Sequence, residues 1–450
     1  MGHLHKNSEN CGDKFPTPQN CTVLGVIVMD KPLKTIFHID EQEYKKTYEN
    51  RFSAPYTEHF NFNVKCDNKG NTVPIFLCIT KDMLLAMERI NRLTVDLEHV
   101  IKPIPPIAIK QFFMSCLREE ILATNAIEGV HSTRKEVNEA IDQQDNYNEK
   151  YNVRLWGIVN KYSKLLNQES ISFATCKDLR AFYDEFVLDE VVKADSSNRP
   201  DGIYFRKGPV SVNNGIESIH EGVLPEDKII SCMETALGIL NNENLPILIR
   251  VGLYHYLFGY IHPFYDGNGR TSRFISSYYL SHYVHPLLGV RLSITIKKTK
   301  RVYYKLFDEA NHPLNKGELT YFVVSFTAII EKALQETVDI LSKKSLQFTD
   351  LLSRLPVIVK GKNNLKIYDI LLQAALFSDN IGATVKEIAA STRLHENTVQ
   401  KHLQELQATT DHIIVHTSTR AFRYELNLDN CFKEKDGSSS RQSGNEIKND

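Results

Sequence analysis

The hydrophobic pattern between residues 80 and 350 most constrains how this chain can fold, because it repeats with helical spacing over most of that length. Thr80 can cap a first helix, whose apolar positions are Met83, Leu84, Met87, Ile90 and Leu93. Similar patterns predict further helices at residues 107–128, 134–145, 148–167, 176–185, 226–241, 245–260, 270–284, 299–310 and 317–344. We therefore predict a mainly α fold with its helical core at residues 107–350.

One segment interrupts the helices. Residues 203–219 are rich in β-branched side chains and contain the turn sequence Asn213-Asn214-Gly215. This combination is typical of a β-hairpin, so we expect two short strands between two helices of the core.

The N-terminal part of the chain has a mixed pattern. Residues 1–20 are polar and predict a flexible lead-in, and residues 21–106 predict a small α+β and helical region. Its β-type runs lie at residues 23–29 and 73–79.

The C-terminal part changes character again. Residues 351–430 have the pattern of three helices followed by two strands, which resembles a winged helix-turn-helix. Residues 431–450 have low complexity and predict a disordered tail.

Composition limits the classes of protein to which the chain can belong. Its 54 Lys and Arg residues balance 55 Asp and Glu residues, which argues against a surface built wholesale for nucleic acid or anionic lipid. It has no run of 18 apolar residues and no apolar signal segment near its first residues, so we expect a cytoplasmic protein with no membrane contact. The eight cysteines form no C-x-x-C pair and predict reduced, structural thiols.

The segment with the clearest chemistry runs from His262 to Arg273 and reads H-P-F-Y-D-G-N-G-R-T-S-R. Pro263 disfavours helical geometry at His262, so the imidazole should emerge at a helix end. The turn Gly267-Asn268-Gly269 can direct its backbone N–H groups outward and continue into a helix. Such a helix N-terminus binds phosphate through amide donors and the helix dipole.

Charged side chains extend this predicted anion site. Arg270 and Arg273 are three residues apart and therefore share a helical face, where two guanidinium groups can bind polyphosphate oxygens. Asp266 suits Mg²⁺, which takes one or two carboxylates together with substrate phosphates. Phe264 is expected to anchor the loop in the core.

This segment resembles the Fic family motif H-x-F-x-(D/E)-G-N-G-R-x-x-R and agrees with it at every specified position. The resemblance extends over about residues 107–330. Within it, Tyr303 and Tyr304 look like part of the adenine-contacting segment of the family. The predicted hairpin looks like the family's substrate flap, formed here by Gly208, Pro209, Val210, Ser211 and Val212. The implied architecture is a Fic-type helical core with a β-hairpin flap, a small α+β N-terminal region and a C-terminal winged helix.

The resemblance implies transfer of AMP from ATP to a Ser, Thr or Tyr hydroxyl of a protein, with release of pyrophosphate. By position, His262 would be the general base and Asp266 would hold Mg²⁺. The phosphates would be held by Gly267, Asn268, Gly269, Arg270 and Arg273. Gly269 favours nucleotidyl transfer, because family members that phosphorylate instead carry a lysine in that part of the loop.

A second motif precedes the core. Residues 124–129 read T-N-A-I-E-G and resemble the family's inhibitory motif (S/T)-x-x-x-E-(G/N). Thr124 and Glu128 are four residues apart and share a helical face, and Gly129 should end the helix. The resemblance implies that Glu128 pairs with Arg273 in the place that the γ-phosphate needs. A bidentate, partly buried pair could compete effectively with nucleotide.

Two other functions stay open. Glu128 could instead align a water molecule that removes AMP from a modified protein. The C-terminal segment could make the chain a DNA-binding regulator, but residues 364–428 carry six basic against seven acidic residues, too few clustered cations for typical counterion release. The expected partners are thus ATP, Mg²⁺ and a hydroxyl-bearing protein, which could be the enzyme itself, and the sequence leaves a homodimer open.

Overall fold

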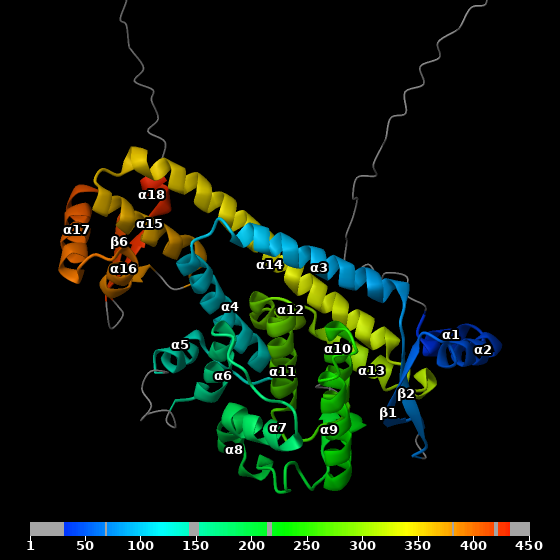
Figure 1. The fold of residues 1–450 in the computed structure, drawn as a ribbon. Helices are drawn as coiled ribbons and strands as arrows, with labels where there is room; N and C mark the ends of the chain where they lie inside the picture. Colours follow the sequence, from blue (N-terminus) through cyan, green and yellow to red (C-terminus); the bar gives the residue numbers. More distant parts are fainter. Residues whose placement is uncertain are drawn as a thin grey trace, which may run out of the picture.

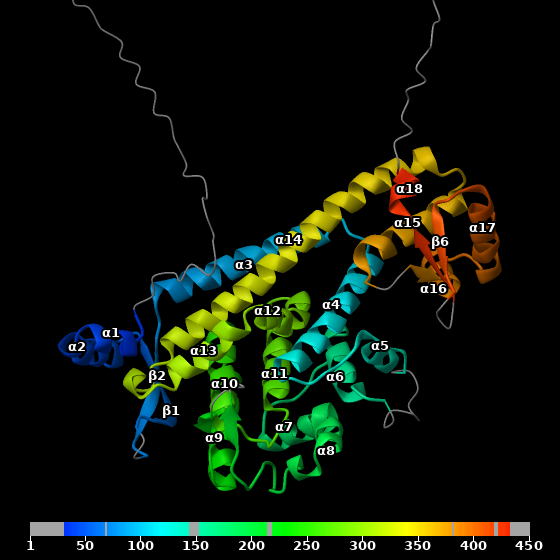
Figure 2. The ribbon, with the colours of Figure 1, turned by 180° about the vertical axis from the view of Figure 1, so that it is seen from behind.

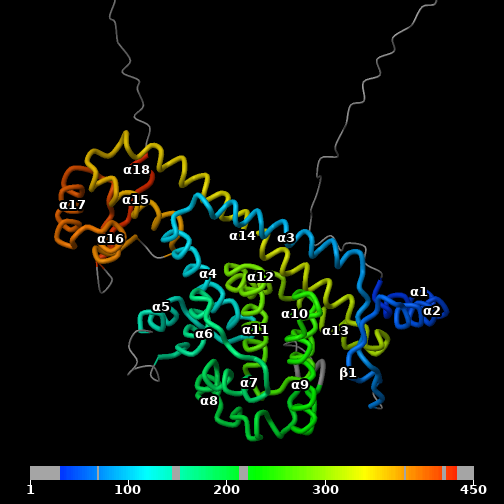
Figure 3. The backbone as a smooth tube through the Cα atoms, in the orientation of Figure 1, coloured from blue at the N-terminus to red at the C-terminus, as the bar shows by residue number. Residues whose placement is uncertain are grey.

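The computed structural model describes residues 31–67, 70–143, 153–213, 218–379, 382–417 and 422–432. The fold is mainly α, as predicted, and the strands of the described residues form three small antiparallel sheets. Two long helices, α3 (Lys81–Ile101) and α14 (Thr320–Ile358), lie side by side (Figures 1 and 2). The N-terminal elements and the last helices lie at opposite ends of this pair, as the tube in Figure 3 shows.

The N-terminal elements form a small α+β unit. In order, they are α1 (Leu33–Ile39), α2 (Glu41–Phe52), β1 (Thr57–Lys65) and β2 (Thr72–Cys78), and the two strands pair antiparallel. Strand β2 confirms the run predicted at residues 73–79. The other predicted run, at 23–29, and the N-terminal lead-in lie outside the described residues.

Helix α3 begins as its sequence predicts, because the Thr80 side chain accepts a hydrogen bond from the backbone N–H of Met83. Helix α14 is longer than predicted and reaches Ile358. Its apolar stripe continues past residue 344 in Phe348, Leu351 and Leu355, which are buried. The boundary predicted at residue 350 therefore falls inside a continuous helix.

The core helices lie against this pair on one side (Figure 1). Helix α10 (Ile247–Ile261) is buried on nearly every side and packs against α9 (Glu226–Leu240) and α11 (Asn268–Tyr283). The other helices are α4 (Pro106–Ile127), α5 (Arg134–Asp142), α6 (Trp156–Leu166), α7 (Cys176–Tyr183), the π-helical η1 (Asp184–Leu188), α8 (Asp189–Ala194), η2 (Ser196–Asn198), η3 (Pro286–Val290), α12 (Leu292–Lys298), α13 (Lys300–Ala310) and η4 (Pro313–Asn315).

The predicted hairpin is present. Strands β3 (Ser211–Asn213) and β4 (Ser218–Glu221) pair antiparallel, with Ser211 opposite Glu221. The turn predicted at residues 213–215 extends beyond the described residues. Residues 203–205 precede the hairpin without joining a strand.

The C-terminal elements follow the order that the sequence indicates. Helices α15 (Lys362–Phe377), α16 (Val385–Thr392) and α17 (Glu396–Thr409) precede strands β6 (Ile413–His416) and β7 (Arg423–Leu426). A short strand β5 (Ala383–Thr384) and a helix α18 (Leu428–Phe432) were not predicted; β7 lies between β5 and β6 in the sheet. We call α15 to α18 with this sheet the C-terminal module.

Two further expectations concern the whole chain. Within the described residues, none of the helices combines the length and apolar character that crossing a lipid bilayer requires. The six cysteines of these residues are all free thiols.

Candidate active site

The loop between α10 and α11 begins as the sequence predicts. Helix α10 ends at Ile261, and His262 adopts a left-handed conformation (φ 52°, ψ 64°) as the residue before Pro263. Gly267 has φ 78° and immediately precedes α11, a conformation that favours glycine. His262 thus lies at the C-terminal end of α10, where the loop begins.

Phe264 anchors the loop, as expected. Its ring is fully buried and stacks on Tyr183 of α7, with ring centroids 3.6 Å apart and planes 8° from parallel. The Tyr183 hydroxyl donates to the carbonyl of Asp266 at 2.9 Å. Helix α7 therefore fixes both the middle and the end of the loop.

The Asn268 side chain bonds to the backbone of Phe264 within the loop. Its side-chain oxygen accepts from the N–H of Phe264 at 3.0 Å and its amide donates to the Phe264 carbonyl at 2.7 Å. Both ends of the side chain thus brace the loop, which leaves the backbone N–H of Asn268 as its means of binding an anion. No side chain of the described residues caps α11, so the first-turn N–H groups at Asn268 and Gly269 form a candidate anion site, which we call the anion cradle.

The two arginines of α11 are both buried, with 1% of each side chain exposed. Arg270 pairs with Glu190 of α8 at 2.9 Å and lies 3.8 Å from Asp266, and its Nε has no hydrogen-bond partner among the described residues. Arg273 pairs with Glu128 at 2.7 Å. The two guanidinium groups therefore form ion pairs with different carboxylates, Glu190 and Glu128.

Glu128 lies directly over the anion cradle. A Cβ atom built on Gly269 would come within 2.2 Å of Glu128 Oε1, so only glycine fits beneath this carboxylate. The Glu128 side chain is 26% exposed. Burial opposes its ionisation, but the charge of Arg273 and its hydrogen bond, together with Arg270 and His262, hold the pKa of Glu128 below its ordinary value.

Thr124 completes the contact with Arg273. The Arg273 Nε donates to Thr124 Oγ1 and Nη2 donates to the Thr124 carbonyl, each at 3.0 Å. The expected bidentate pair with Glu128 is therefore wrong in detail, because one arm of the fork binds the carboxylate and the other two donors bind Thr124. All three contacts come from the last turns of α4.

Side chains of α13 bind the C-terminal end of α4. Gly129 has φ 76° and follows the last helical residues, as predicted. The Ile127 carbonyl accepts from Lys300 Nζ at 2.8 Å and from the Tyr304 hydroxyl at 3.3 Å. In this structure Tyr304 supports α4 rather than standing open to an adenine ring.

Tyr303 is part of the core instead of the cradle surface. It is buried, and its hydroxyl pairs with His255 Nε2 at 2.8 Å. His255 also lies 2.9 Å from Ser276 Oγ, and its burial, together with Arg273, lowers its pKa to about 3. An adenine-contacting role for Tyr303 has no support in this geometry.

The predicted flap residues lie beside the loop. The N–H of Gly208 donates to the Tyr265 hydroxyl at 2.8 Å, and the Val210 carbonyl accepts from Gly222 at 3.0 Å. Pro209 is exposed between them, and Ser211 and Val212 begin strand β3.

Sequence reasoning missed Glu190, Lys300 and Arg206. Arg206 is fully buried and binds carbonyl groups of the flap and of the loop. None of the three stands within a recognisable motif, because each reaches its partner only through the packing of distant segments.

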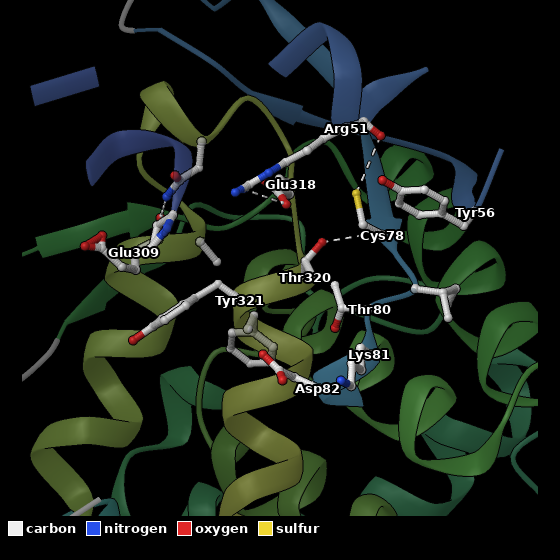
Figure 4. A pocket seen from close by; sticks show the side chains of 15 residues that line it. Arg51, Tyr56, Cys78, Thr80, Lys81, Asp82, Glu309, Glu318, Thr320 and Tyr321 are labelled. Atoms are coloured by element: carbon white, nitrogen blue, oxygen red, sulfur yellow. Dashed lines mark hydrogen bonds and ion pairs between the residues drawn. The ribbon is translucent and has the colours of Figure 1, made fainter. Parts of the chain in front are cut away.

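Two cavities differ in their relation to this site. A cavity of about 910 Å³ borders Asp266, Arg270 and Glu190 and extends toward Trp156. A second cavity, of about 330 Å³, lies where the N-terminal unit meets α14. Figure 4 shows two contacts there: the ion pair of Arg51 with Glu318, and the hydrogen bond that the Cys78 N–H donates to Thr320 Oγ1. Only the first is adjacent to the cradle.

No cluster of three or more potential metal-ligating side chains occurs in the part of the chain that the structure describes. A single carboxylate, Asp266, beside an anion cradle fits Mg²⁺, which takes its remaining ligands from phosphate and water.

Comparison with known protein families gives one match. Residues 175–280 match the model of the Fic/DOC family, a range that includes the loop from His262 to Arg273 and the hairpin but neither α4 nor the C-terminal module.

Two solved structures are similar to the chain. One is a Fic family protein from Desulfovibrio desulfuricans G20 (19% identity, TM-score 0.48), with 77% of this chain and 96% of that chain covered. The other is a Fic domain containing signaling protein from Bacteroides thetaiotaomicron VPI-5482 (16% identity, TM-score 0.41), with 58% and 97% covered. The match at residues 175–280 therefore identifies a Fic/DOC domain within the chain.

Proposed function

We propose that this protein transfers AMP from ATP to a hydroxyl side chain of a target protein and that Glu128 inhibits the transfer. The family match supports a nucleotide-dependent transferase acting on proteins. The position of Glu128 carries the proposal further, because a carboxylate at the N-terminus of α11 and beside Arg273 occupies a place suited to a phosphate group.

The cradle would bind the phosphates. The N–H groups of Asn268 and Gly269 point out of the first turn of α11, and Arg270 has a buried Nε without a partner among the described residues. Asp266 would hold Mg²⁺, which when bound neutralises phosphate charge and aligns the leaving group. These groups favour an in-line displacement at the α-phosphorus.

His262 would act as the general base. Its Nδ1 faces the Gly259 carbonyl at 3.4 Å, which favours the tautomer protonated on Nδ1 and makes Nε2 the basic atom. The target hydroxyl oxygen forms a bond to the α-phosphorus while its proton passes to Nε2, and the bond to the β-phosphate oxygen breaks to release pyrophosphate.

The inhibition follows from the burial of Arg273. Because 1% of its side chain is exposed, Arg273 needs an anion beside it; leaving such a charge unpaired costs about 3–5 kcal/mol. Glu128 supplies that anion in this structure. A nucleotide phosphate could take the same place only after the carboxylate leaves.

Intact-mass analysis after incubation with ATP and Mg²⁺ tests the proposal. We expect Glu128→Gly to gain adenylyl groups on itself or on an added target faster than the natural protein, and Glu128→Gly/His262→Ala to gain none. Glu243→Gly is the matched control, because Glu243 is an exposed acid in a turn, and it should behave as the natural protein does.

Two outcomes would contradict the proposal. Equal rates for Glu128→Gly and the natural protein would remove the inhibitory role, and no mass gain in any variant would remove the transfer itself. If the natural protein instead strips AMP from a modified target and Glu128→Gly does not, the hydrolase replaces the transferase.

A further inference from the structure

Arg206 is a buried cation that the proposed mechanism does not use. Its side chain is fully buried in the segment between η2 and β3. No ion pair with a carboxylate is present for it among the described residues; its hydrogen bonds go to backbone carbonyls. Such burial without an anion is costly, so the contacts that Arg206 makes need an explanation.

The carbonyls that Arg206 binds belong to three separate segments. Nη1 donates to the carbonyl of Gly208 at the start of the flap at 2.7 Å, and Nη2 donates to the carbonyl of Val223, just after strand β4 of the same hairpin, at 3.0 Å. Nε donates to the carbonyl of His262 at 2.8 Å, and Nη2 also reaches Ile261 at 3.4 Å. One planar guanidinium thus joins the segments before and after the β3–β4 hairpin to His262, the residue proposed as base.

Backbone contacts reinforce the same junction. The N–H of Arg206 donates to the Pro263 carbonyl at 3.2 Å, and the N–H of Val223 donates to Ile261 at 3.1 Å. At Gly222 a Cβ atom would come within 2.2 Å of Arg206 Nη2 and 3.2 Å of His262 Cβ. The flap, the guanidinium and the histidine therefore pack in direct contact, without room for a larger residue.

A second contact joins the start of the flap to Tyr265 of the loop. The Tyr265 hydroxyl accepts from the N–H of Gly208 at 2.8 Å and donates to Asp201 at 3.0 Å. The Asp201 carboxylate also accepts from the N–H of Lys207 at 2.8 Å. The Tyr265 side chain binds the start of the flap, whereas that of Arg206 also binds the His262 carbonyl, so the two offer a matched comparison.

We propose that Arg206 is a positioning residue that holds the flap and His262 as one rigid unit. A target strand that pairs with the flap edge then carries its hydroxyl to a fixed place relative to the imidazole. This role rests on the proposed function. Arginine suits it better than lysine, because its fork can bind several carbonyls in one plane.

Hydrogen exchange in the full-length Glu128→Gly protein tests the junction without measuring activity. In Arg206→Met we expect exchange to rise together in peptides from residues 204–213 and from residues 256–266. In Tyr265→Phe we expect it to rise in the first set far more than in the second. Should Arg206→Met fail to fold, Gly222→Ala displaces the guanidinium and takes its place in the comparison.

Transfer and nucleotide binding test the consequence. We expect Arg206→Met to bind ATP within about threefold of the Glu128→Gly parent while its transfer rate falls about 100-fold, the size of effect that a 1 Å misplacement produces. Arg206→Lys should recover part of that rate. A purely structural role would instead lower binding and rate together.

The outcomes separate the two proposals. Exchange that rises in only one set of peptides, or in neither, overturns the role of Arg206 whatever the activity. Joint exchange with an unchanged transfer rate overturns it as a positioning residue. If the Glu128→Gly parent itself transfers no AMP, the proposed function fails, and the exchange experiment still decides whether Arg206 joins the flap to His262.

Discussion

At the scale of single residues, the candidate site depends on one close contact. Gly269 lies beneath the Glu128 carboxylate, with 2.2 Å between its hypothetical Cβ and Glu128 Oε1 and 2.9 Å to Arg273 Nη1. The absence of a side chain at residue 269 therefore leaves the space that the Glu128 carboxylate occupies. The contact can be tested by a double-mutant cycle.

We expect Gly269→Ala to lower the free energy of unfolding by about 1–3 kcal/mol, because the added methyl group displaces Glu128 from Arg273. In the Glu128→Gly background the same change should cost less than about 1 kcal/mol, since its main obstacle is gone. Denaturant unfolding of the four proteins measures the coupling. Equal losses in both backgrounds would show that Glu128 does not lie over Gly269.

The Glu128–Arg273 pair also predicts a pH dependence. Because the folded protein holds the pKa of Glu128 below 4.5, its ordinary value, the unfolded chain binds more protons as the solution is acidified, and the stability from the pair is lost as pH falls through the folded pKa. The difference in Tm between the natural protein and Glu128→Gln should stay constant between about pH 6 and 8 and shrink below about pH 4.5.

Glu119→Gln serves as the control for that measurement. Its pair with Arg134 is largely exposed on both sides, so its removal should change Tm little at any of these pH values. A Glu128→Gln difference that grows on acidification would contradict the assigned direction.

At the scale of elements, the end of α4 decides where Glu128 lies. Gly129 turns the chain at φ 76°, and Lys300 and Tyr304 bind the Ile127 carbonyl just before it. The helix end is thus fixed by its own glycine and by α13. Both contacts orient a carboxylate that follows the last helical residue.

We expect Gly129→Ala to destabilise the protein by about 1 kcal/mol, through backbone strain alone, because nothing lies within 4 Å of the added Cβ. Gly238→Ala is the matched control: Gly238 lies inside α9 with equally open space and no positive φ, so alanine should stabilise the helix by up to about 1 kcal/mol. Thermal unfolding of both variants measures the contrast. The same sign for both would contradict the left-handed helix end.

At the scale of the whole molecule, the C-terminal module is joined to α4. Arg118 of α4 pairs with Asp379, which follows α15, at 2.6 Å, and Ser115 Oγ accepts from the N–H of Asp379 at 2.9 Å. The helix that bears Glu128 at one end thus carries the module near the other (Figure 2). The same helix therefore contacts both the module and Arg273 of the candidate site.

We expect Asp379→Asn to destabilise the protein by about 2–4 kcal/mol, because it leaves the buried Arg118 guanidinium, 7% exposed, without its carboxylate. Asp350→Asn removes an exposed pair with Arg354 and should cost less than about 1 kcal/mol. Denaturant unfolding compares the two. Similar small losses would show that the docking does not depend on this pair.

Local patterns predicted the elements that need no distant partner. Helical spacing identified the core helices, Thr80 and Gly129 marked helix ends, and the run from His262 to Arg273 predicted a loop opening into a helix N-terminus. These succeed because caps, glycine conformations and hydrophobic periodicity act over a few residues. The length of α14 was underestimated, although its apolar stripe continues through Phe348, Leu351 and Leu355; these last turns pack against α15 and α18.

The sequence by itself determined that the chain is mainly helical, because helical spacing acts over a few residues. It also predicted a candidate anion cradle beside a histidine, because the residues concerned follow one another from His262 to Arg273. Only the tertiary structure decided that Glu190 pairs with Arg270, that Thr124 shares Arg273 with Glu128, and that Arg206 joins the flap to His262. The reason is physical. A buried charge is satisfied by whatever polar group folding brings within about 3 Å, and segments far apart in the chain supply those groups.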